Sequence, residues 1–215
     1  MNLKALSHDI TPPQDYEPQG TLRWDASLTD MADFFGSDKG TIKHNYTPVY
    51  DEHLAKLKPE PINLLEIGVA CGASLKMWSR YFLYGKITGV DIRPECAELC
   101  KGYPSIEIKI ADATKERMFG EWDVIIDDGS HIAGHIVKTF QLNWPFLKSG
   151  GKYFIEDLRC TYHLGYLHCA KVEEEGDKDR GQLLKMLDRA MRRCDEMGDV
   201  KSIHYTPQML ILEKR

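Results

Sequence analysis

The chain has 215 residues, of which 42% are hydrophobic and 28% are charged, a composition typical of globular proteins. Its formal net charge is -5 and its lysines and arginines form no cluster, which argues against a nucleic-acid partner. No apolar run approaches the ~18 to 20 residues of a membrane span, and the N-terminus lacks the apolar core of a signal peptide. We therefore expect a cytoplasmic protein without a membrane partner.

The six cysteines are scattered and form no CxxC pair, which fits reduced thiols rather than a disulfide framework. One segment, residues 160–169 (CTYHLGYLHC), contains two cysteines and two histidines and raises the question of zinc. Its spacing matches no usual structural zinc pattern. The favoured interpretation is a loop whose His and Tyr side chains face a cleft.

The N-terminal part of the chain predicts an arm followed by two helices. Residues 1–28 are rich in Pro, Asp and Gln and predict a flexible arm. A short helix follows, capped by Ser27 or Thr29. A loop with the sequence GSDKGTIKHNY then leads to a second helix, which has Tyr50 and Leu54 on one face.

From residue 61 onward, short apolar runs alternate with helical segments. Helices are predicted at 74–82, 94–103 and 133–147, the last disrupted at Pro145, and strands at 62–69, 86–92, 106–112, 122–128 and 150–158. This alternation predicts an α/β fold with a doubly wound, Rossmann-like sheet.

The end of the chain departs from this alternation. A long helix, with Leu183 and Leu187 at helical spacing, precedes two apolar runs that are separated only by TPQ. Such a short link cannot make a parallel crossover, so the last two strands should form an antiparallel hairpin. The complete prediction is a seven-stranded sheet, mostly parallel, with an antiparallel C-terminal hairpin strand.

Acidic residues end the first three predicted strands, where ligands bind in open parallel sheets. Glu66 precedes a turn with Gly68 and Gly72, whose G-x-x-x-G spacing differs from the pyrophosphate-binding G-x-G-x-x-G motif. Asp91, followed by Ile92, can bind ribose hydroxyls, and Asp112, followed by Ala113, can meet an adenine amine. Each acid alone is better explained as a helix cap. Together they predict a cofactor with a ribose, an adenine and a positive charge: S-adenosyl-L-methionine.

The fourth and fifth predicted strands end in the pairs Asp127-Asp128 and Glu156-Asp157. Four carboxylates at neighbouring strand ends repel one another unless they are protonated or bridged by a cation. Since side chains alternate along a strand, we assign Asp127 to the cofactor side and Asp128, Glu156 and Asp157 to Mg²⁺. The alternative is that Asp128 and Asp157 only cap the helices that follow.

His131 lies three residues beyond Asp128 and is the predicted general base. A metal held by Asp128 would lower the pKa of the hydroxyl that His131 deprotonates, so both residues are predicted to be catalytic. His135 is the competing histidine. Because it is further from the carboxylates, we expect it to be a packing or surface residue.

Several motifs resemble a known family over residues 29–160. The segments FGSDKGT, LLEIGVACGASLKMW, GVDI, DVIIDDGSH and LKSGGKYFIEDL resemble the magnesium-dependent sugar O-methyltransferases of macrolide and polyketide antibiotic pathways. These are class I S-adenosylmethionine-dependent enzymes, and a family named cephalosporin hydroxylase is a relative. The resemblance implies that Asp128, Glu156 and Asp157 bind magnesium, that His131 is the base, and that Glu66 to Gly72 and Asp91 bind the cofactor.

The resemblance also implies a domain organisation. Residues 29–60 would form a helical cap over the cofactor, with Thr41, His44 and Tyr46 as cofactor or acceptor contacts. A loop that only covers the core is an equal alternative for this segment. Residues 61–215 would form the methyltransferase domain, with 160–198 as an insertion on the acceptor side.

The sequence thus predicts an S-adenosylmethionine- and Mg²⁺-dependent O-methyltransferase. Its partner would be a small-molecule acceptor with a hydroxyl group, a sugar or a glycosylated natural product. Three alternatives stay open: a catechol-type O-methyltransferase, a hydroxylase and a non-catalytic binder of the cofactor. Redox-metal oxygenases prefer two histidines and one carboxylate, which the predicted site lacks. The acceptor's identity and a homo-oligomeric assembly also stay open.

Overall fold

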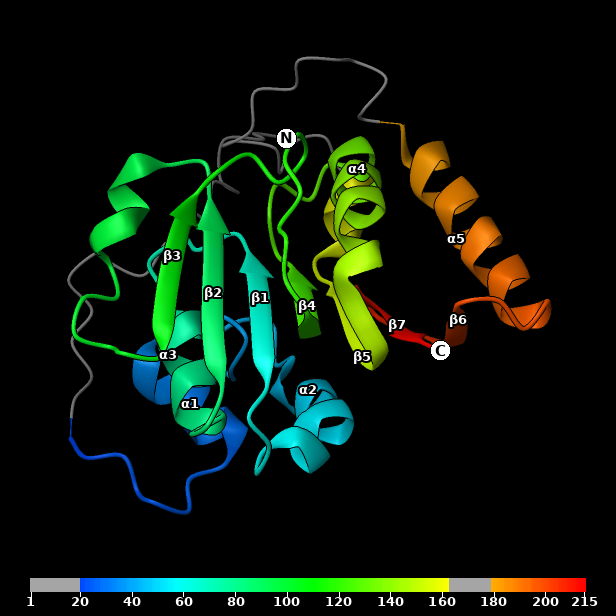
Figure 1. Cartoon of the computed structure of the whole chain (residues 1–215). Coiled ribbons are helices and arrows are strands. Elements are labelled where there is room, and N and C mark those ends of the chain that lie inside the picture. Colours follow the sequence, from blue (N-terminus) through cyan, green and yellow to red (C-terminus); the bar gives the residue numbers. More distant parts are fainter. Residues whose placement is uncertain (1–19, 163–178) are drawn as a thin grey trace, which may run out of the picture.

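The structure is a computed structural model that describes residues 20–162 and 179–215. A single sheet of seven strands runs through it in the order β3-β2-β1-β4-β5-β7-β6 (Figure 1). The strands are β1 Asn63–Ile67, β2 Lys86–Asp91, β3 Ile106–Ile110, β4 Trp122–Asp127, β5 Leu147–Ile155, β6 Val200–Thr206 and β7 Met209–Lys214. All pairs among β1 to β5 are parallel, whereas β7 is antiparallel to both β5 and β6. The predicted fold class is confirmed.

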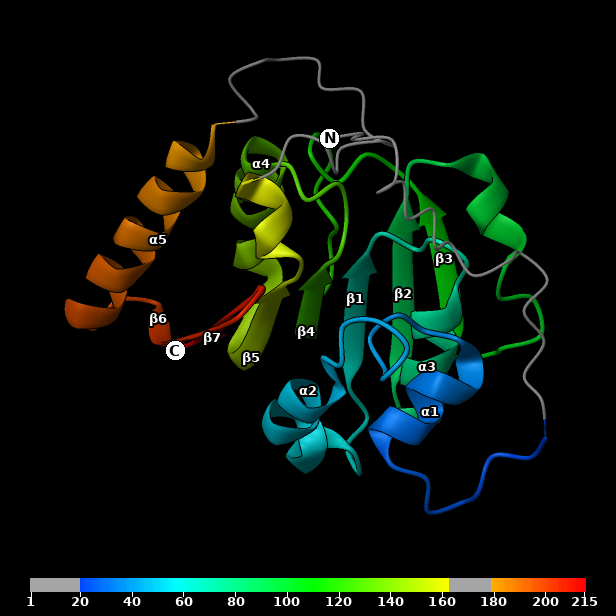
Figure 2. The same ribbon diagram turned by 180° about the vertical axis from the view of Figure 1, so that it is seen from behind.

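Helices cover both faces of this sheet (Figures 1 and 2). The α-helices are α1 Leu28–Phe35, α2 Thr47–Leu54, α3 Ala73–Tyr81, α4 Ala133–Asn143 and α5 Arg180–Asp195. The described residues also contain the 3₁₀ segments η2 Ala55–Leu57, η3 Pro94–Glu98, η4 Trp144–Phe146 and η5 Leu158–Tyr162. Among the described residues, no helix is long and apolar enough to cross a membrane.

Two hydrophobic clusters lie on opposite faces of the sheet, and the alternation of side chains along the strands separates them. Leu64 and Phe154 pack with residues of α1, α2 and α3, whereas Leu65 and Tyr153 pack with residues of α4 and α5. The same alternation decides where the acids at the strand ends point. The side chains of Glu66 and Glu156 point to the face of Leu64 and Phe154. That of Asp127, two residues after Ile125, points to the opposite face.

Local sequence explains the start and end of α1. The Ser27 side chain accepts a hydrogen bond from the Asp30 backbone N–H at 3.1 Å, and the Asp30 carboxylate accepts one from the Ser27 N–H at 2.9 Å. This capping box confirms Ser27 as the predicted cap. Gly36 ends the helix with φ of +70°, which glycine adopts without steric cost. The chain then turns back toward the sheet.

Two local predictions were wrong. The helix predicted at 94–103 is only the short η3, and the thiols of Cys96 in η3 and Cys100 after it contact the backbone of residues 70–72. The described residues 111–121, for which no helix was predicted, link β3 to β4 without one. The strand predicted at 150–158 is β5 Leu147–Ile155, so Gly150 lies inside it, with φ of +78°, where the register with β4 shifts.

Candidate active site

The ends of β1, β4 and β5 are aligned, because Asp127 is the register partner of both Ile67 and Ile155. The turns after β1 and β4 therefore touch. Gly68 has φ of +94°, and a Cβ at this position would lie 2.1 Å from the carbonyl oxygen of Asp128. Gly72, with φ of +78°, begins α3. Both glycines are required by the backbone of the turn, which leaves their role in cofactor binding a prediction.

Asp91 lies at the end of β2 with its carboxylate already bonded. Its Oδ2 accepts a hydrogen bond from the Val69 N–H at 3.0 Å, and the Arg93 guanidinium pairs with it at 3.1 Å. Burial raises the pKa of Asp91, but these hydrogen bonds outweigh burial and leave the pKa below its usual value. Ile92 beside it is 63% exposed. Contacts of Asp91 and Ile92 with a ribose stay a prediction.

Asp112 caps the turn after β3. Its Oδ1 accepts hydrogen bonds from the backbone N–H and the hydroxyl of Thr114 at 2.9 and 2.6 Å. Ala113 between them is buried. Such local hydrogen bonds to the backbone are what the alternative explanation, a capping residue, expects of an acid at this position. An adenine contact of Asp112 stays a prediction.

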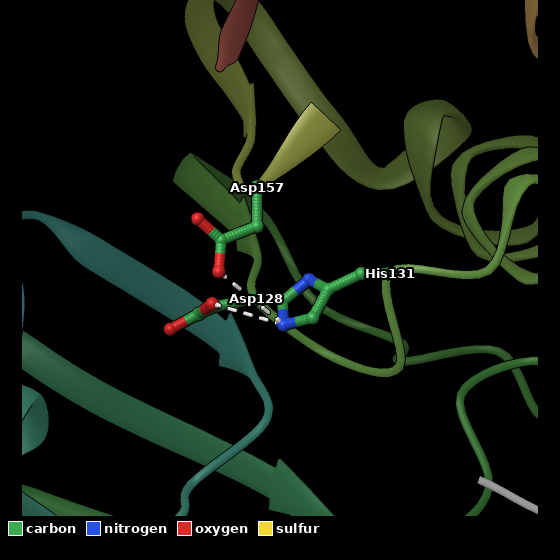
Figure 3. Close-up of side chains that lie close together, drawn as sticks. All are labelled: Asp128, His131 and Asp157. Atoms are coloured by element: carbon green, nitrogen blue, oxygen red, sulfur yellow. Dashed lines mark ion pairs between the residues drawn. The ribbon is translucent and has the colours of Figure 1, made fainter. Parts of the chain in front are cut away.

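Three side chains converge just beyond β4 and β5: Asp128, His131 and Asp157 (Figure 3). Each offers one ligand atom, and these atoms lie within 4.8 Å of one another. Nε2 of His131 is 3.6 Å from Oδ2 of Asp157 and 4.0 Å from Oδ1 of Asp128. His131 and Asp157 both have positive φ, +57° and +54°. Such backbone conformations are costly in non-glycine residues and often occur at functional sites.

Lys39, which sequence analysis missed, lies beside this group. Its side chain is fully buried, with Nζ 2.5 Å from Oδ2 of Asp128, 2.8 Å from Oε1 of Glu156 and 3.4 Å from Oε1 of Glu66. Burial lowers the pKa of Lys39, but the three carboxylates raise it more and keep the ammonium charged. No local sequence pattern identifies this lysine, because Glu66 is 27 residues away and Asp128 and Glu156 are further still.

The predicted magnesium ligands are thereby divided between two neighbouring environments. Asp128 and Asp157 meet His131, whereas the Glu156 carboxylate points to Lys39 and accepts a hydrogen bond from the Tyr50 hydroxyl. Burial and the charge of Asp128 raise the pKa of Glu156. The assignment of Glu156 as a metal ligand stays a prediction.

The segment between α1 and α2, residues 36–46, covers the site from one side and is called the covering segment below. Tyr46 donates a 2.5 Å hydrogen bond from its hydroxyl to Oδ1 of Asp157, and Nδ1 of His44 lies 3.7 Å from the same oxygen. The rings of His44 and Tyr46 stack at 4.9 Å. Thr41 instead bonds to Asp33 through its N–H and its hydroxyl, at 2.8 and 2.6 Å. In this structure, His44 and Tyr46 reach the acidic site and Thr41 fastens the loop.

Asp127 and His135 lie apart from the three-residue group. Asp127 is buried on the other face of the sheet, where its Oδ1 accepts a hydrogen bond from the Gly129 N–H at 3.4 Å and burial raises its pKa to about 7. The opposite orientations of Asp127 and Asp128 follow from strand alternation, whereas a cofactor contact of Asp127 stays a prediction. Nδ1 of His135 lies 2.8 Å from the Ser130 hydroxyl, so this histidine fastens the loop before α4.

The donor set fits a hard divalent cation. Two carboxylates and an imidazole lie close enough to share one ion, and carboxylate oxygens are the protein ligands that Mg²⁺ prefers. The CTYHLGYLHC segment is described only to residue 162, so the zinc question lies outside the described residues. The same holds for most of the predicted N-terminal arm and for residues 163–178 of the predicted insertion.

The chain has close relatives among curated proteins, although no family model matches it. It is 37% identical over 172 residues to 8-demethyl-8-(2-methoxy-alpha-L-rhamnosyl)-tetracenomycin-C 3'-O-methyltransferase of Streptomyces olivaceus, which covers 75% of this chain and 44% of the relative. It is 32% identical over 212 residues to 8-demethyl-8-alpha-L-rhamnosyl tetracenomycin-C 2'-O-methyltransferase of the same organism, covering 87% and 54%. The chain thus spans about half the length of the relatives it matches.

Solved structures agree with these relatives. MycE methyltransferase from the mycinamycin biosynthetic pathway, in complex with Mg, SAH and mycinamycin VI, is 27% identical to this chain with a TM-score of 0.73. The match covers 88% of this chain and 54% of that one. A caffeoyl-CoA O-methyltransferase-like protein from Staphylococcus aureus, 15% identical with a TM-score of 0.57, shares the fold. The expected kinship with sugar O-methyltransferases is confirmed.

Proposed function

We propose, on the premise that the homologues of this chain are sugar O-methyltransferases of macrolide and polyketide pathways, that it methylates a hydroxyl of a sugar or glycosylated natural product. The methyl donor would be S-adenosyl-L-methionine and the metal Mg²⁺. The observation that carries this proposal is the convergence of Asp128, His131 and Asp157 at the ends of β4 and β5, directly beside the glycine turn of β1.

The carboxylates supply the metal site of this proposal. Asp128 and Asp157 would hold Mg²⁺. Glu156, whose Oε1 contacts the Lys39 ammonium, would be the third carboxylate ligand. When bound, the ion would lower the pKa of an acceptor hydroxyl that coordinates it.

His131 would accept the proton of that hydroxyl on Nε2. Its Nε2 lies 3.6 Å from Oδ2 of Asp157 and 4.0 Å from Oδ1 of Asp128, so the base would lie directly beside the proposed metal ligands. With S-adenosylmethionine bound, the deprotonated oxygen would attack its methyl carbon, and the new C–O bond would form as the C–S bond breaks. The products are a methyl ether and S-adenosylhomocysteine, and alignment of the two reactants supplies much of the rate.

The cofactor would lie along the aligned strand ends. The residues assigned to it are Glu66, Gly68, Gly72, Asp91, Ile92, Asp112, Ala113 and Asp127, with Thr41, His44 and Tyr46 on the covering segment. Of these, Glu66 is fully buried with Oε1 3.4 Å from Nζ of Lys39, so we assign it an indirect role through Lys39 rather than contact with the cofactor.

The experiment combines calorimetry with a product screen. S-adenosylmethionine binding is measured with and without Mg²⁺, and then glycosides, free sugars and catechols are screened for a mass gain of one methyl group. A methylated glycoside, lost with EDTA and in His131→Ala, would support the proposal. Methylation of catechols alone would favour the catechol-type alternative. Binding without any methylated product would favour a non-catalytic binder, and no binding would refute the cofactor assignment.

A further inference from the structure

Lys39 lies among carboxylates in the interior of the protein. Its side chain is 0% exposed, yet Nζ is within 3.4 Å of an oxygen of each of Glu66, Asp128 and Glu156. Burying an ammonium is costly unless it is paired, and these three partners provide that compensation. Removing the lysine would leave buried carboxylates without their cation.

The acidic residues lie on two sides of the site: an inner side toward the Lys39 ammonium and an outer side toward His131. Asp128 turns Oδ2 toward Lys39 and leaves Oδ1 on the side of His131. Glu156 is held on the inner side by Lys39 and by the Tyr50 hydroxyl. Asp157 is held on the outer side by Tyr46. The position of Nζ thus decides which oxygens remain for an ion beside His131.

The backbone around Lys39 fixes that position. Its carbonyl oxygen accepts hydrogen bonds from the N–H groups of Tyr46 at 2.8 Å and Thr47 at 3.2 Å, at the start of α2. Gly40 packs so closely that a Cβ there would lie 2.1 Å from Oδ1 of Asp33 in α1. The ammonium is therefore presented by a loop that is fastened to two helices, which argues against a lysine that fills space by chance.

We propose that Lys39 is a positioning residue that serves as the resident cation of the acidic site. Its ammonium binds Glu156 and one oxygen of Asp128. It therefore competes with a divalent ion for both carboxylates and lowers the affinity of the site for that ion. This inference rests on the proposed magnesium site. It assigns to the covering segment a role in metal affinity that goes beyond covering the cofactor.

The test is calorimetric titration of the full chain with Mg²⁺ in the absence of cofactor and acceptor. Lys39→Met keeps an unbranched side chain, one atom shorter, and removes its charge, so we expect Mg²⁺ to bind at least about tenfold more tightly. The metal-free variant should melt at a lower temperature than the wild type and gain more from saturating Mg²⁺. A merely structural role predicts the opposite change in affinity, since a damaged site binds metal more weakly.

Two variants serve as controls. Lys39→Arg retains the charge and should keep the Mg²⁺ affinity within about threefold of the wild type. Lys43→Met removes a half-buried lysine of the same loop that pairs only with Asp38 at 3.4 Å among the contacts described, and it should leave the affinity unchanged. If Lys39→Met does not fold, Lys39→Met/Glu66→Gln removes the charge of one buried partner as well, and the same tightening is expected.

The possible failures are distinct. Equal or weaker Mg²⁺ binding in Lys39→Met or Lys39→Met/Glu66→Gln, with normal binding by the wild type, would overturn the inference and leave the proposed function standing. Absence of Mg²⁺ binding by the wild type would overturn the proposed metal site, and the inference with it.

Discussion

The hydroxyl of Tyr46 donates a 2.5 Å hydrogen bond to Oδ1 of Asp157, although 111 positions separate the two residues. Tyr46 immediately precedes α2 and Asp157 follows β5, so this bond joins the covering segment to the acidic site. Groups that hydrogen-bond to metal ligands orient them and tune their affinity. The covering segment therefore belongs to the proposed metal site as its outer shell.

Tyr46→Phe should weaken Mg²⁺ binding by about tenfold, because Asp157 loses the donor that orients its carboxylate. The affinity is measured by calorimetry. Tyr84→Phe removes the hydroxyl of a tyrosine that is 69% exposed and should change nothing. Unchanged Mg²⁺ affinity in Tyr46→Phe would mean that Asp157 is oriented by other contacts.

The two histidines near Asp128 should behave differently. His131→Ala should lower the rate of methyl transfer at least about 100-fold, because it removes the proposed general base, while S-adenosylmethionine still binds. His135→Ala removes the contact with Ser130, outside the group of Asp128, His131 and Asp157, and should retain most of the rate. Rates come from product formation and cofactor affinity from calorimetry. Equal losses in the two variants would contradict the assignment of His131 as the base.

Gly68→Ala should destabilise the fold through a collision as well as through its backbone conformation. Gly102 provides a matched control, since its φ of +93° is close to the +94° of Gly68 but a Cβ there would meet nothing within 4 Å. We expect Gly102→Ala to cost about 1 kcal/mol of unfolding free energy. Gly68→Ala should cost about 2 kcal/mol or more beyond that, because its Cβ would strike the Asp128 carbonyl. Denaturant unfolding measures both, and equal losses would refute the close approach of the two turns.

His53 should make stability depend on pH. Its Nε2 lies 2.8 Å from Nδ1 of His204, joining α2 to β6. Burial and His204 lower the pKa of His53 below 6.5, helped by Lys152 and opposed by Glu52 and Glu213. As the pH falls below 6.5, the unfolded chain takes up the proton first, so folding stability declines; above 6.5 the effect vanishes.

The comparison is between wild type and His53→Gln, which can still hydrogen-bond but does not titrate. Denaturant unfolding at pH 8 and pH 5 should show a smaller loss of stability for the variant. Parallel pH profiles for the two proteins would show that the pair contributes no pH dependence.

Much of the architecture could be predicted from the sequence, because strand periodicity and connection length are local properties. Five short apolar runs and the TPQ link were enough to indicate a seven-stranded sheet with an antiparallel end. Consecutive parallel strands tend to lie together, so Asp128 and Asp157 were expected to be neighbours. The helix predicted at 94–103 failed because the inward turn of Cys96 and Cys100 is a tertiary contact, which the local pattern does not contain.

What only the tertiary structure decided is how the charges are paired. In the sequence, Lys39 is one more polar residue of a loop, yet folding buries it against Asp128, 89 positions away. A buried ammonium must find carboxylates and buried carboxylates must find a cation, so the packing of distant segments selects the partners. That selection turns Glu156 toward Lys39 and Tyr50, and it leaves Asp128, Asp157 and His131 together at the edge of the sheet.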